Sequence, residues 1–579
     1  MKTVLRQLGR YRRDTWLCIA MTTLEVIMEI LLPFITALII DEGLEAASLP
    51  TVYRYGALMV VMSFCGLAFG ALGGKFAASA SSGLAANLRE AVYNNIQTFS
   101  FSNIDKFSVP GLVTRMTTDI TNVQNAYMML IRVAVRSPLM LVFSYIMCLI
   151  ISPKLSLTFL LAVLFLAVVL GVIMVVTMRI FTEVFSKYDD LNASVQENVS
   201  AIRVVKAFVR EDYEDKKFAK ASQNLYRLFV KAEGLLAFNN PAMMLAVYFC
   251  IIMVSWLGAH FIVSGSMSAG ELTSLFSYVM SLMMSLMMLS MVAVMITMSM
   301  ASIRRISEVL NETPDLAEPE SPVYKVADGS IDFDHVDFSY KHGSGKNALS
   351  DIDLHIRSGE TIGVIGGTGS GKSSLVNLIC RLYDTDKGTV KVGGVDVRKY
   401  DMETLRNEVS VVLQKNTLFS GTILDNLRWG NPDATEEECK AACHAACADE
   451  FIDRFPDGYH TRIERGGANV SGGQKQRLCI ARALLKKPKV LILDDSTSAV
   501  DTATDAKIRA AFAKEIPGTT KIIIAQRISS VENADRILVL DNGRINGFDT
   551  HENLLKTNAI YREIYESQVK GGGDFDQPA

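Results

Sequence analysis

The sequence lacks a strong net charge. It carries 58 lysines and arginines against 61 aspartates and glutamates, which gives a formal net charge of −3 over 579 residues. A chain so nearly balanced has no overall field that would attract nucleic acid or acidic substrates. We therefore expect no nucleic-acid partner.

The sequence also lacks the regular cysteine spacing of a disulfide framework. Its nine cysteines are scattered, and several lie inside apolar runs, which predicts reduced, buried side chains that pack as small hydrophobes. One group contains possible zinc ligands: Cys439, Cys443, His444 and Cys447. Cysteines spaced four residues apart line one helical face, whereas zinc sites usually place paired ligands at both ends of a loop. We expect packing rather than metal here.

No cleavable signal peptide is evident, because the first apolar run far exceeds the 7–15 residues of a signal core. Half of the residues are hydrophobic, yet 21% are charged. This mixture, in a chain too long for one core, predicts an apolar part joined to an ordinary globular part.

Six long apolar runs fill the first part of the chain. Each can cross a hydrocarbon layer of roughly 30 Å at about 1.5 Å per residue. Basic residues gather before the first run and in the long segments 78–133 and 179–237, so the positive-inside rule places these in the cytoplasm. Both segments contain few helix breakers and are predicted to extend the membrane helices, turning near 108–111 and 201–208. The six runs are 16–40, 54–77, 134–152, 157–178, 238–264 and 273–298.

The remaining chain reads as a soluble domain. Prolines among acidic residues indicate an exposed linker over 312–328, after a membrane domain of residues 1–311. Strands and helices alternate over 329–568, which predicts an α/β domain with a mostly parallel core sheet, and 569–579 is predicted as a disordered tail. The expected strands are 331–338, 361–365, 390–392, 409–413, 490–493, 521–524 and 537–540.

A phosphate-binding motif follows the apolar strand at 361–365 and precedes a helix-like run that begins at Ser374. Its glycines let backbone N–H groups close around phosphate oxygens, and the helix adds its positive end. We expect Lys372 to reach the β- and γ-phosphates of ATP and Ser373 to bind Mg²⁺. The motif is Gly366, Gly367, Thr368, Gly369, Ser370, Gly371, Lys372 and Ser373.

A second apolar strand ends in Asp494, a position typical of the carboxylate that faces Mg²⁺ on a bound nucleotide. Alone, either motif could be structural, since a strand-end aspartate can simply cap a turn. Together they predict an ATP and Mg²⁺ site.

Between these motifs, Ser471, Gly472, Gly473 and Gln474 resemble the signature of ATP-binding cassette (ABC) transporters. The resemblance extends to Gln414 as the Q-loop residue near Mg²⁺, to Tyr340 as the aromatic that stacks on adenine, and to Ser498-Ala499-Val500-Asp501 as the D-loop. Residues 112–116 and 202–208 also resemble the intracellular loops of exporters, so the likeness covers nearly the whole chain. It implies half of an ATP-hydrolysing bacterial plasma-membrane exporter, whose two ATP sites each lie between the phosphate loop of one half and the signature of the other.

Two residues depart from the family pattern. The family normally has a glutamate general base where this chain has Asp495, and a switch histidine where it has Gln526. Aspartate is one methylene shorter, and a displacement of about 1 Å can cost roughly 10²-fold in rate. Glutamine cannot carry the proton or charge available to histidine. The combination resembles the degenerate half of heterodimeric exporters and implies a partner with an intact glutamate and histidine; the alternative is a slow homodimer.

Two features of the membrane domain bear on the kind of substrate that is transported. Methionines recur along one face of the sixth apolar run, and Met284, Met287 and Met291 are candidates to line a substrate cavity, although methionine also serves as packing or lipid-facing filler. Glu25 and Glu29 lie on one face of the first run, where they could attract cationic substrates or pair with a polar neighbour. The leading expectation is export of amphipathic drugs or lipids. Import of metal chelates and a nucleotide-gated regulatory subunit are the alternatives.

Overall fold

The computed structural model describes residues 2–340, 347–495 and 500–571. The chain forms two compact units: the first runs to Thr98 and continues from Phe107 to Glu312, and the second combines Phe99–Lys106 with the chain from Thr313 onward. Residues 99–106 were expected within the membrane domain. They belong to the second unit because Ser100 and Ser102 donate hydrogen bonds to Asp315 and because Tyr383 donates to Asp105.

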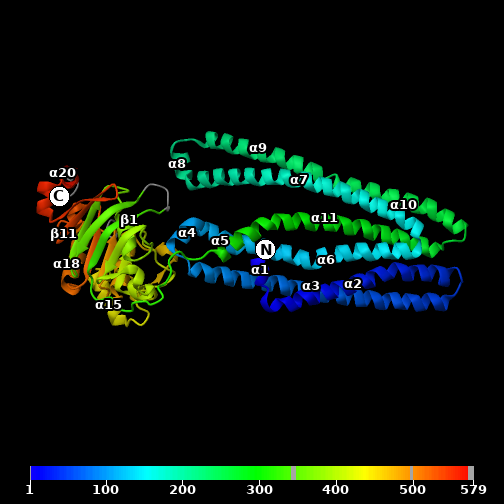
Figure 1. Cartoon of the computed structure of the whole chain (residues 1–579), viewed down its shortest axis with the longest axis horizontal. Helices are drawn as coiled ribbons and strands as arrows, with labels where there is room; N and C mark the ends of the chain where they lie inside the picture. Colours follow the sequence, from blue (N-terminus) through cyan, green and yellow to red (C-terminus); the bar gives the residue numbers. More distant parts are fainter. Residues whose placement is uncertain (1, 341–346, 496–499, 572–579) are drawn as a thin grey trace. The chain divides into compact units, whose positions relative to one another are not determined.

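The first unit is built from long helices that lie side by side in Figure 1. Helix α3 has 49 residues, about 74 Å at 1.5 Å per residue, which exceeds the thickness of a bilayer. Helix α2 packs against α3, α6 against α11, and α7 against α9 and α10. The helices up to the linker are α1 (Lys2–Arg6), α2 (Arg12–Leu38), α3 (Leu49–Gln97), α4 (Phe101–Phe107), α5 (Val109–Thr114), α6 (Ile120–Ile151), α7 (Pro153–Ser200), α8 (Ile202–Ala207), α9 (Glu211–Leu236), α10 (Asn239–Val263) and α11 (Ala269–Asn311).

Six helical stretches among the described residues are long and apolar enough to cross a membrane, and each overlaps one predicted run; the runs 134–152 and 238–264 extend one residue past their stretches. The short helix α8 lies at the second predicted turn. The first turn is more than a Pro-Gly break, because the short helix α4 lies between the end of α3 and Ser108. Ser108, with a φ of 56°, is the N-cap of α5.

The second unit contains two main sheets (Figure 1). A six-stranded sheet has the order β12-β11-β3-β10-β9-β6 and is parallel except for β12, whereas an antiparallel sheet has the order β2-β1-β4-β5. The strands are β1 (Ile331–Phe338), β2 (Leu349–Ile356), β3 (Thr361–Gly366), β4 (Lys387–Val392), β5 (Val395–Asp396), β6 (Val409–Val412), β7 (Gly421–Thr422), β8 (Arg462–Ile463), β9 (Val490–Asp494), β10 (Thr520–Ile524), β11 (Arg536–Asp541) and β12 (Arg544–Asp549).

Strand β9 shows why the strands of the parallel sheet are continuous apolar runs in the sequence. All five of its residues are buried; Val490 and Ile492 join one hydrophobic cluster, whereas Leu491 and Leu493 join another. Side chains alternate across a strand, so a sheet covered on both faces needs apolar residues at every position. The helices of this unit are α12 (Lys372–Ile379), α13 (Met402–Glu408), α14 (Ile423–Leu427), α15 (Glu436–Ala445), α16 (Asp449–Ile452), α17 (Gly472–Leu484), α18 (Thr502–Glu515), α19 (His551–Thr557) and α20 (Ala559–Gly571).

Two boundary expectations need correction. The linker is not uniformly exposed: Leu316 and Val326 are buried, and Val326 belongs to a hydrophobic cluster of the second unit. The tail predicted from 569 begins too early, because α20 continues to Gly571. Residues 572–579 lie outside the described part of the chain.

Candidate nucleotide site

The phosphate loop connects the end of β3 to the start of α12. Gly369 and Gly371 have φ values of 80° and 99°, a left-handed conformation that side chains rarely adopt. A Cβ atom at Gly371 would come within 2.8 Å of the Ala348 carbonyl oxygen. The glycines are thus required by backbone shape and by close packing, and they leave the N-terminus of α12 open toward a phosphate.

Lys372 folds back over this loop. Its Nζ donates hydrogen bonds of 2.8 Å to both the Gly366 and Gly367 carbonyl oxygens. Burial lowers the pKa of Lys372, and the nearby carboxylates of Asp494 and Asp495 oppose that shift. The ammonium therefore lies where phosphate oxygens could replace two carbonyl partners.

Asp494 closes the other side of the site. It ends β9, directly beside Ile524 of β10, and is only 6% exposed. Burial raises the pKa of Asp494, and a hydrogen bond from Ser373 opposes this shift. A hydroxyl and a carboxylate in contact supply the oxygen ligands that Mg²⁺ prefers, so these residues fit the expected ion.

Asp495 and Gln526, the two residues that depart from the family pattern, contact each other. Gln526 Nε2 donates a hydrogen bond of 2.9 Å to Asp495 Oδ2. Asp495 has a φ of 48°, and its backbone N–H donates to the Ile524 carbonyl oxygen at 3.0 Å. Its carboxylate is thus held toward the end of β10 by a neutral amide.

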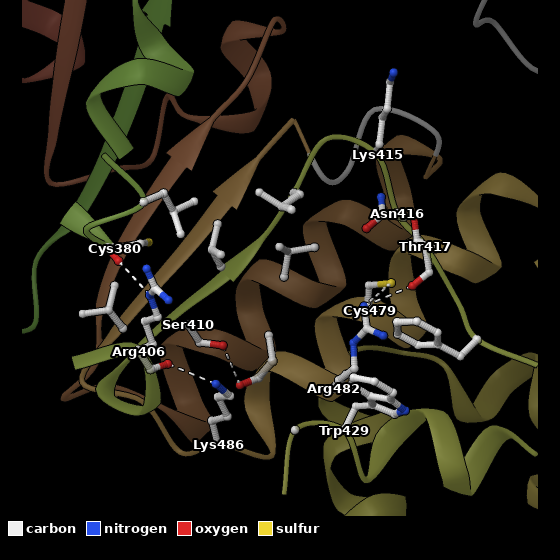
Figure 2. Close-up of a pocket in the computed structure, with 18 residues that line it drawn as sticks. Cys380, Arg406, Ser410, Lys415, Asn416, Thr417, Trp429, Cys479, Arg482 and Lys486 are labelled. Carbon is white, nitrogen blue, oxygen red and sulfur yellow. Dashed lines mark hydrogen bonds between the residues drawn. The ribbon is translucent and has the colours of Figure 1, made fainter. Parts of the chain in front are cut away.

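Gln414 lies two residues beyond β6, and β6 pairs with β9 so that Val412 faces Leu493. Gln414 therefore leaves the sheet at the same edge as Asp494, and its side chain is exposed. The segment that follows forms one wall of a groove of about 430 Å³, shown in Figure 2. Arg482 fixes that wall with a hydrogen bond of 3.3 Å to the Thr417 carbonyl oxygen.

Tyr340 is 47% exposed and belongs to an aromatic cluster. Its ring meets Tyr383 edge-on at 5.1 Å and Phe338 at 4.8 Å, and its hydroxyl lies 3.0 Å from Ser374 Oγ in α12. The predicted adenine-stacking residue is therefore joined to the phosphate-loop helix. Tyr383, whose hydroxyl donates to Asp105 at 2.7 Å, was not identified from the sequence, because its only signal is an isolated aromatic.

The signature occupies the start of α17. Ser471 is the N-cap: its hydroxyl accepts from the Gln474 backbone N–H at 3.3 Å, and its own N–H donates to Gln474 Oε1 at 2.8 Å. Ser471 and Gly472 are exposed, so the positive end of a 13-residue helix faces outward. Helix α17 packs against α14, α15 and β6. Of the D-loop, Ser498 and Ala499 lie outside the described residues, and Asp501 caps α18.

The cysteine group lies on and just beyond α15. Cys439 and Cys443 are fully buried in the hydrophobic cluster, and burial raises the pKa of Cys439, Cys443 and Cys447. His444 points elsewhere and hydrogen-bonds Asp449 at 2.7 Å. Packing accounts for the three cysteines, and the contact with Asp449 accounts for His444.

In the first unit, Glu25 and Glu29 both pair with Arg136 of α6. Arg136 donates at 2.6 Å to Glu25 Oε1 and at 2.5 Å to Glu29 Oε2. The sequence allowed these glutamates either to attract a cationic substrate or to pair with a polar neighbour, and the structure contains the pairing. Gly70 of α3 makes room, because a Cβ there would lie 3.1 Å from the Glu25 carboxylate. Arg136 was missed, although it falls inside the third apolar run, where a charge is itself a signal.

The methionine face of α11 is largely exposed within this chain. Met284, Met287 and Met291 are 49%, 39% and 59% exposed, whereas Tyr278 is buried and donates a hydrogen bond of 2.8 Å to the Ile30 carbonyl oxygen of α2. The methionines therefore lie away from the face of α11 that packs on α2.

Comparisons with known proteins agree with this geometry. A family model of the ABC transporter transmembrane region matches residues 15–287, and a model of the ABC transporter family matches residues 349–498. The chain is 35% identical over 568 residues to the uncharacterized ABC transporter ATP-binding protein YfiB of Bacillus subtilis, covering 98% of each chain. It is 36% identical over 575 residues to the uncharacterized ABC transporter ATP-binding protein Rv1273c of Mycobacterium tuberculosis, again covering 98% of each.

Among solved structures, a bacterial Atm1-family ABC exporter with ATP bound superposes with a TM-score of 0.83 at 26% identity, covering 96% of this chain and 99% of the other. Six apolar helices in this fold make the protein a multi-pass integral membrane protein. A chain that matches both family models and aligns with such relatives along nearly its whole length belongs to the ABC transporter family and has the fold of an ABC exporter.

Proposed function

We propose that this chain is one subunit of a heterodimeric exporter, with a site that binds ATP and hydrolyses it weakly. The observation that carries the proposal is the contact between Gln526 and Asp495, at 2.9 Å. It combines a carboxylate that is one methylene short with a neutral amide in place of the switch histidine. A shortfall of about 1 Å at a reacting group can cost roughly 10²-fold in rate.

The binding residues remain complete, which separates binding from hydrolysis. Lys372 is poised over the phosphate loop, Asp494 lies against Ser373, and Tyr340 is exposed beside α12. Ser471 presents an open helix N-terminus that can contact a nucleotide held by another chain. The chain would thus retain ATP at its own site while completing a competent site on a partner that carries the glutamate and the histidine.

The partner requirement is tested by purifying this chain alone and together with a half that carries both residues. Alone, the chain is expected to hydrolyse ATP about 10²-fold more slowly than the pair, because Asp495 is one methylene shorter than the glutamate that normally acts as general base. A Lys372→Ala version of this chain controls for contaminating ATPases. Robust turnover by the isolated chain would contradict the heterodimer and favour a homodimer.

We further propose that the cargo is an amphipathic drug or lipid that contacts the methionine face of α11. Methionine is flexible and polarizable and can adapt to apolar ligands of different shape. The exposed side chains of Met284, Met287 and Met291 support this role. Because Arg136 occupies both Glu25 and Glu29, a cationic group on the cargo would have to compete with an existing ion pair.

Replacing Met287 and Met291 together with alanine is expected to change which compounds stimulate ATP hydrolysis, with basal hydrolysis similar. The matched control replaces both with leucine, which keeps volume and apolarity and should preserve more of the profile. ATPase assays of the assembled pair across a compound panel give the measurement. An unchanged profile in the alanine variant would assign these methionines to lipid contact or packing.

A further inference from the structure

The last helix reaches back to the backbone that carries Gln526. Gln568 of α20 donates from Nε2 to the Gln526 carbonyl oxygen at 2.8 Å, and its Oε1 accepts from the Ile528 N–H at 2.8 Å. One side-chain amide thus brackets the segment in which the chain leaves β10 and enters the short helix η7 (Ile528–Ser530). Only an amide side chain offers a donor and an acceptor in this fork.

Buried contacts hold helix α20 in place, so the side chain of Gln568 extends from a fixed helix. Tyr561 is fully buried, and its hydroxyl lies 2.7 Å from His551 Nδ1. Ile564 and Tyr565 pack against the hydrophobic cluster that contains Ile528. The helix is therefore held by its apolar face, and Gln568, which is exposed, reaches from its last turn.

The bracket matters because the Gln526 side chain has two possible directions. It donates to Asp495 Oδ2, and from the same position an amide could donate to the terminal phosphate of a nucleotide. Which contact forms depends on where the Gln526 backbone lies, and the sheet fixes that backbone only as far as Ala525, whose N–H donates to the Val364 carbonyl oxygen at 3.3 Å. Beyond it, the bonds from Gln568 hold the segment from the side of α20.

We infer that Gln568 is a positioning residue that sets the reach of Gln526 toward the γ-phosphate bound by this chain. The inference rests on the proposed function, in which Gln526 takes the place of the switch histidine at a site that retains ATP. It assigns the C-terminal helix a part in distinguishing a nucleoside triphosphate from a diphosphate.

The test measures the affinities of the purified full-length chain for Mg-AMP-PNP and MgADP and takes their ratio. Gln568→Met has a similar length but loses both hydrogen bonds, and it is expected to lower the preference for AMP-PNP about threefold to tenfold while leaving ADP affinity unchanged. Gln568→Glu keeps the acceptor for Ile528 and loses the donor, so an intermediate or equal loss is expected. Glu563→Gln, on an exposed position of the same helix, is the matched control.

A purely structural role for Gln568 would shift the melting temperature or weaken both nucleotides alike, and either result without a change in the ratio would overturn the inference. Gln568→Met should also add nothing in a Gln526→Ala background, because it acts through Gln526. A further fall there would overturn it too. If Gln526→Ala leaves the ratio of AMP-PNP to ADP affinity unchanged, the γ-phosphate role of Gln526 is contradicted. If Gln526→Ala lowers this ratio but Gln568→Met does not, only the positioning role of Gln568 is contradicted.

Discussion

Changing Ser471→Arg in this chain is expected to lower ATP hydrolysis by the assembled exporter about 10²–10³-fold. The exposed N-cap of α17 would then carry a bulky cation where an open helix N-terminus must contact the nucleotide of the partner. A preorganised donor aimed at a transferring phosphoryl group is worth about 3–4 kcal/mol, which corresponds to this range of rates. Steady-state ATPase assays of the pair give the measurement.

The same substitution also removes a helix cap, which by itself costs about 1 kcal/mol of stability. Thr435→Arg is the matched control, since Thr435 caps α15 through the same reciprocal pair of hydrogen bonds. It should leave hydrolysis nearly unchanged. Asp495→Asn should likewise lower turnover only modestly, because that carboxylate is already one methylene shorter than the usual glutamate and is engaged by Gln526. If Asp495→Asn abolishes turnover as fully as Ser471→Arg, Asp495 is a working base and the site is not degenerate.

The converse substitution should gain activity. Asp495→Glu together with Gln526→His is expected to raise hydrolysis at this chain's own site about 10²-fold, because the longer carboxylate recovers roughly 1 Å of reach and the imidazole can carry a proton. The gain is measured in a pair whose partner glutamate is changed to glutamine, so that only this site can turn over. Asp495→Glu alone, with Gln526 kept, separates the two contributions. No gain in the double variant would show that something other than these two residues limits the site.

The nucleotide-binding residues could be read from the sequence because chemistry fixes their spacing. Gly371 must be glycine at a φ of 99°, with the Ala348 carbonyl 2.8 Å from any Cβ, and Lys372 must follow it directly. The buried strands β3 and β9 could also be predicted from the sequence. Both faces of the parallel sheet are covered, so the interior positions of these strands are apolar.

Strands β2 and β12 escaped prediction because they lie toward the edges of their sheets, where polar residues alternate with apolar ones. The pairing of Arg136 with Glu25 joins helices more than one hundred positions apart in the sequence, and no local period records such a contact. Gln568 leaves even less trace, because it bonds to backbone atoms, which every residue supplies. The missed features are thus tertiary contacts, whereas the predicted ones are local requirements.

The proposal that this chain binds ATP but hydrolyses it far more slowly than its partner can be tested by identifying the nucleotide on its phosphate loop during turnover. The assembled exporter is photo-crosslinked with 8-azido-ATP carrying radiolabel at either the α- or the γ-phosphate, and the label on each chain is counted. We expect this chain to retain both labels equally, while the partner retains the α-label and loses the γ-label. Loss of the γ-label from this chain to the same extent as from its partner would contradict the account.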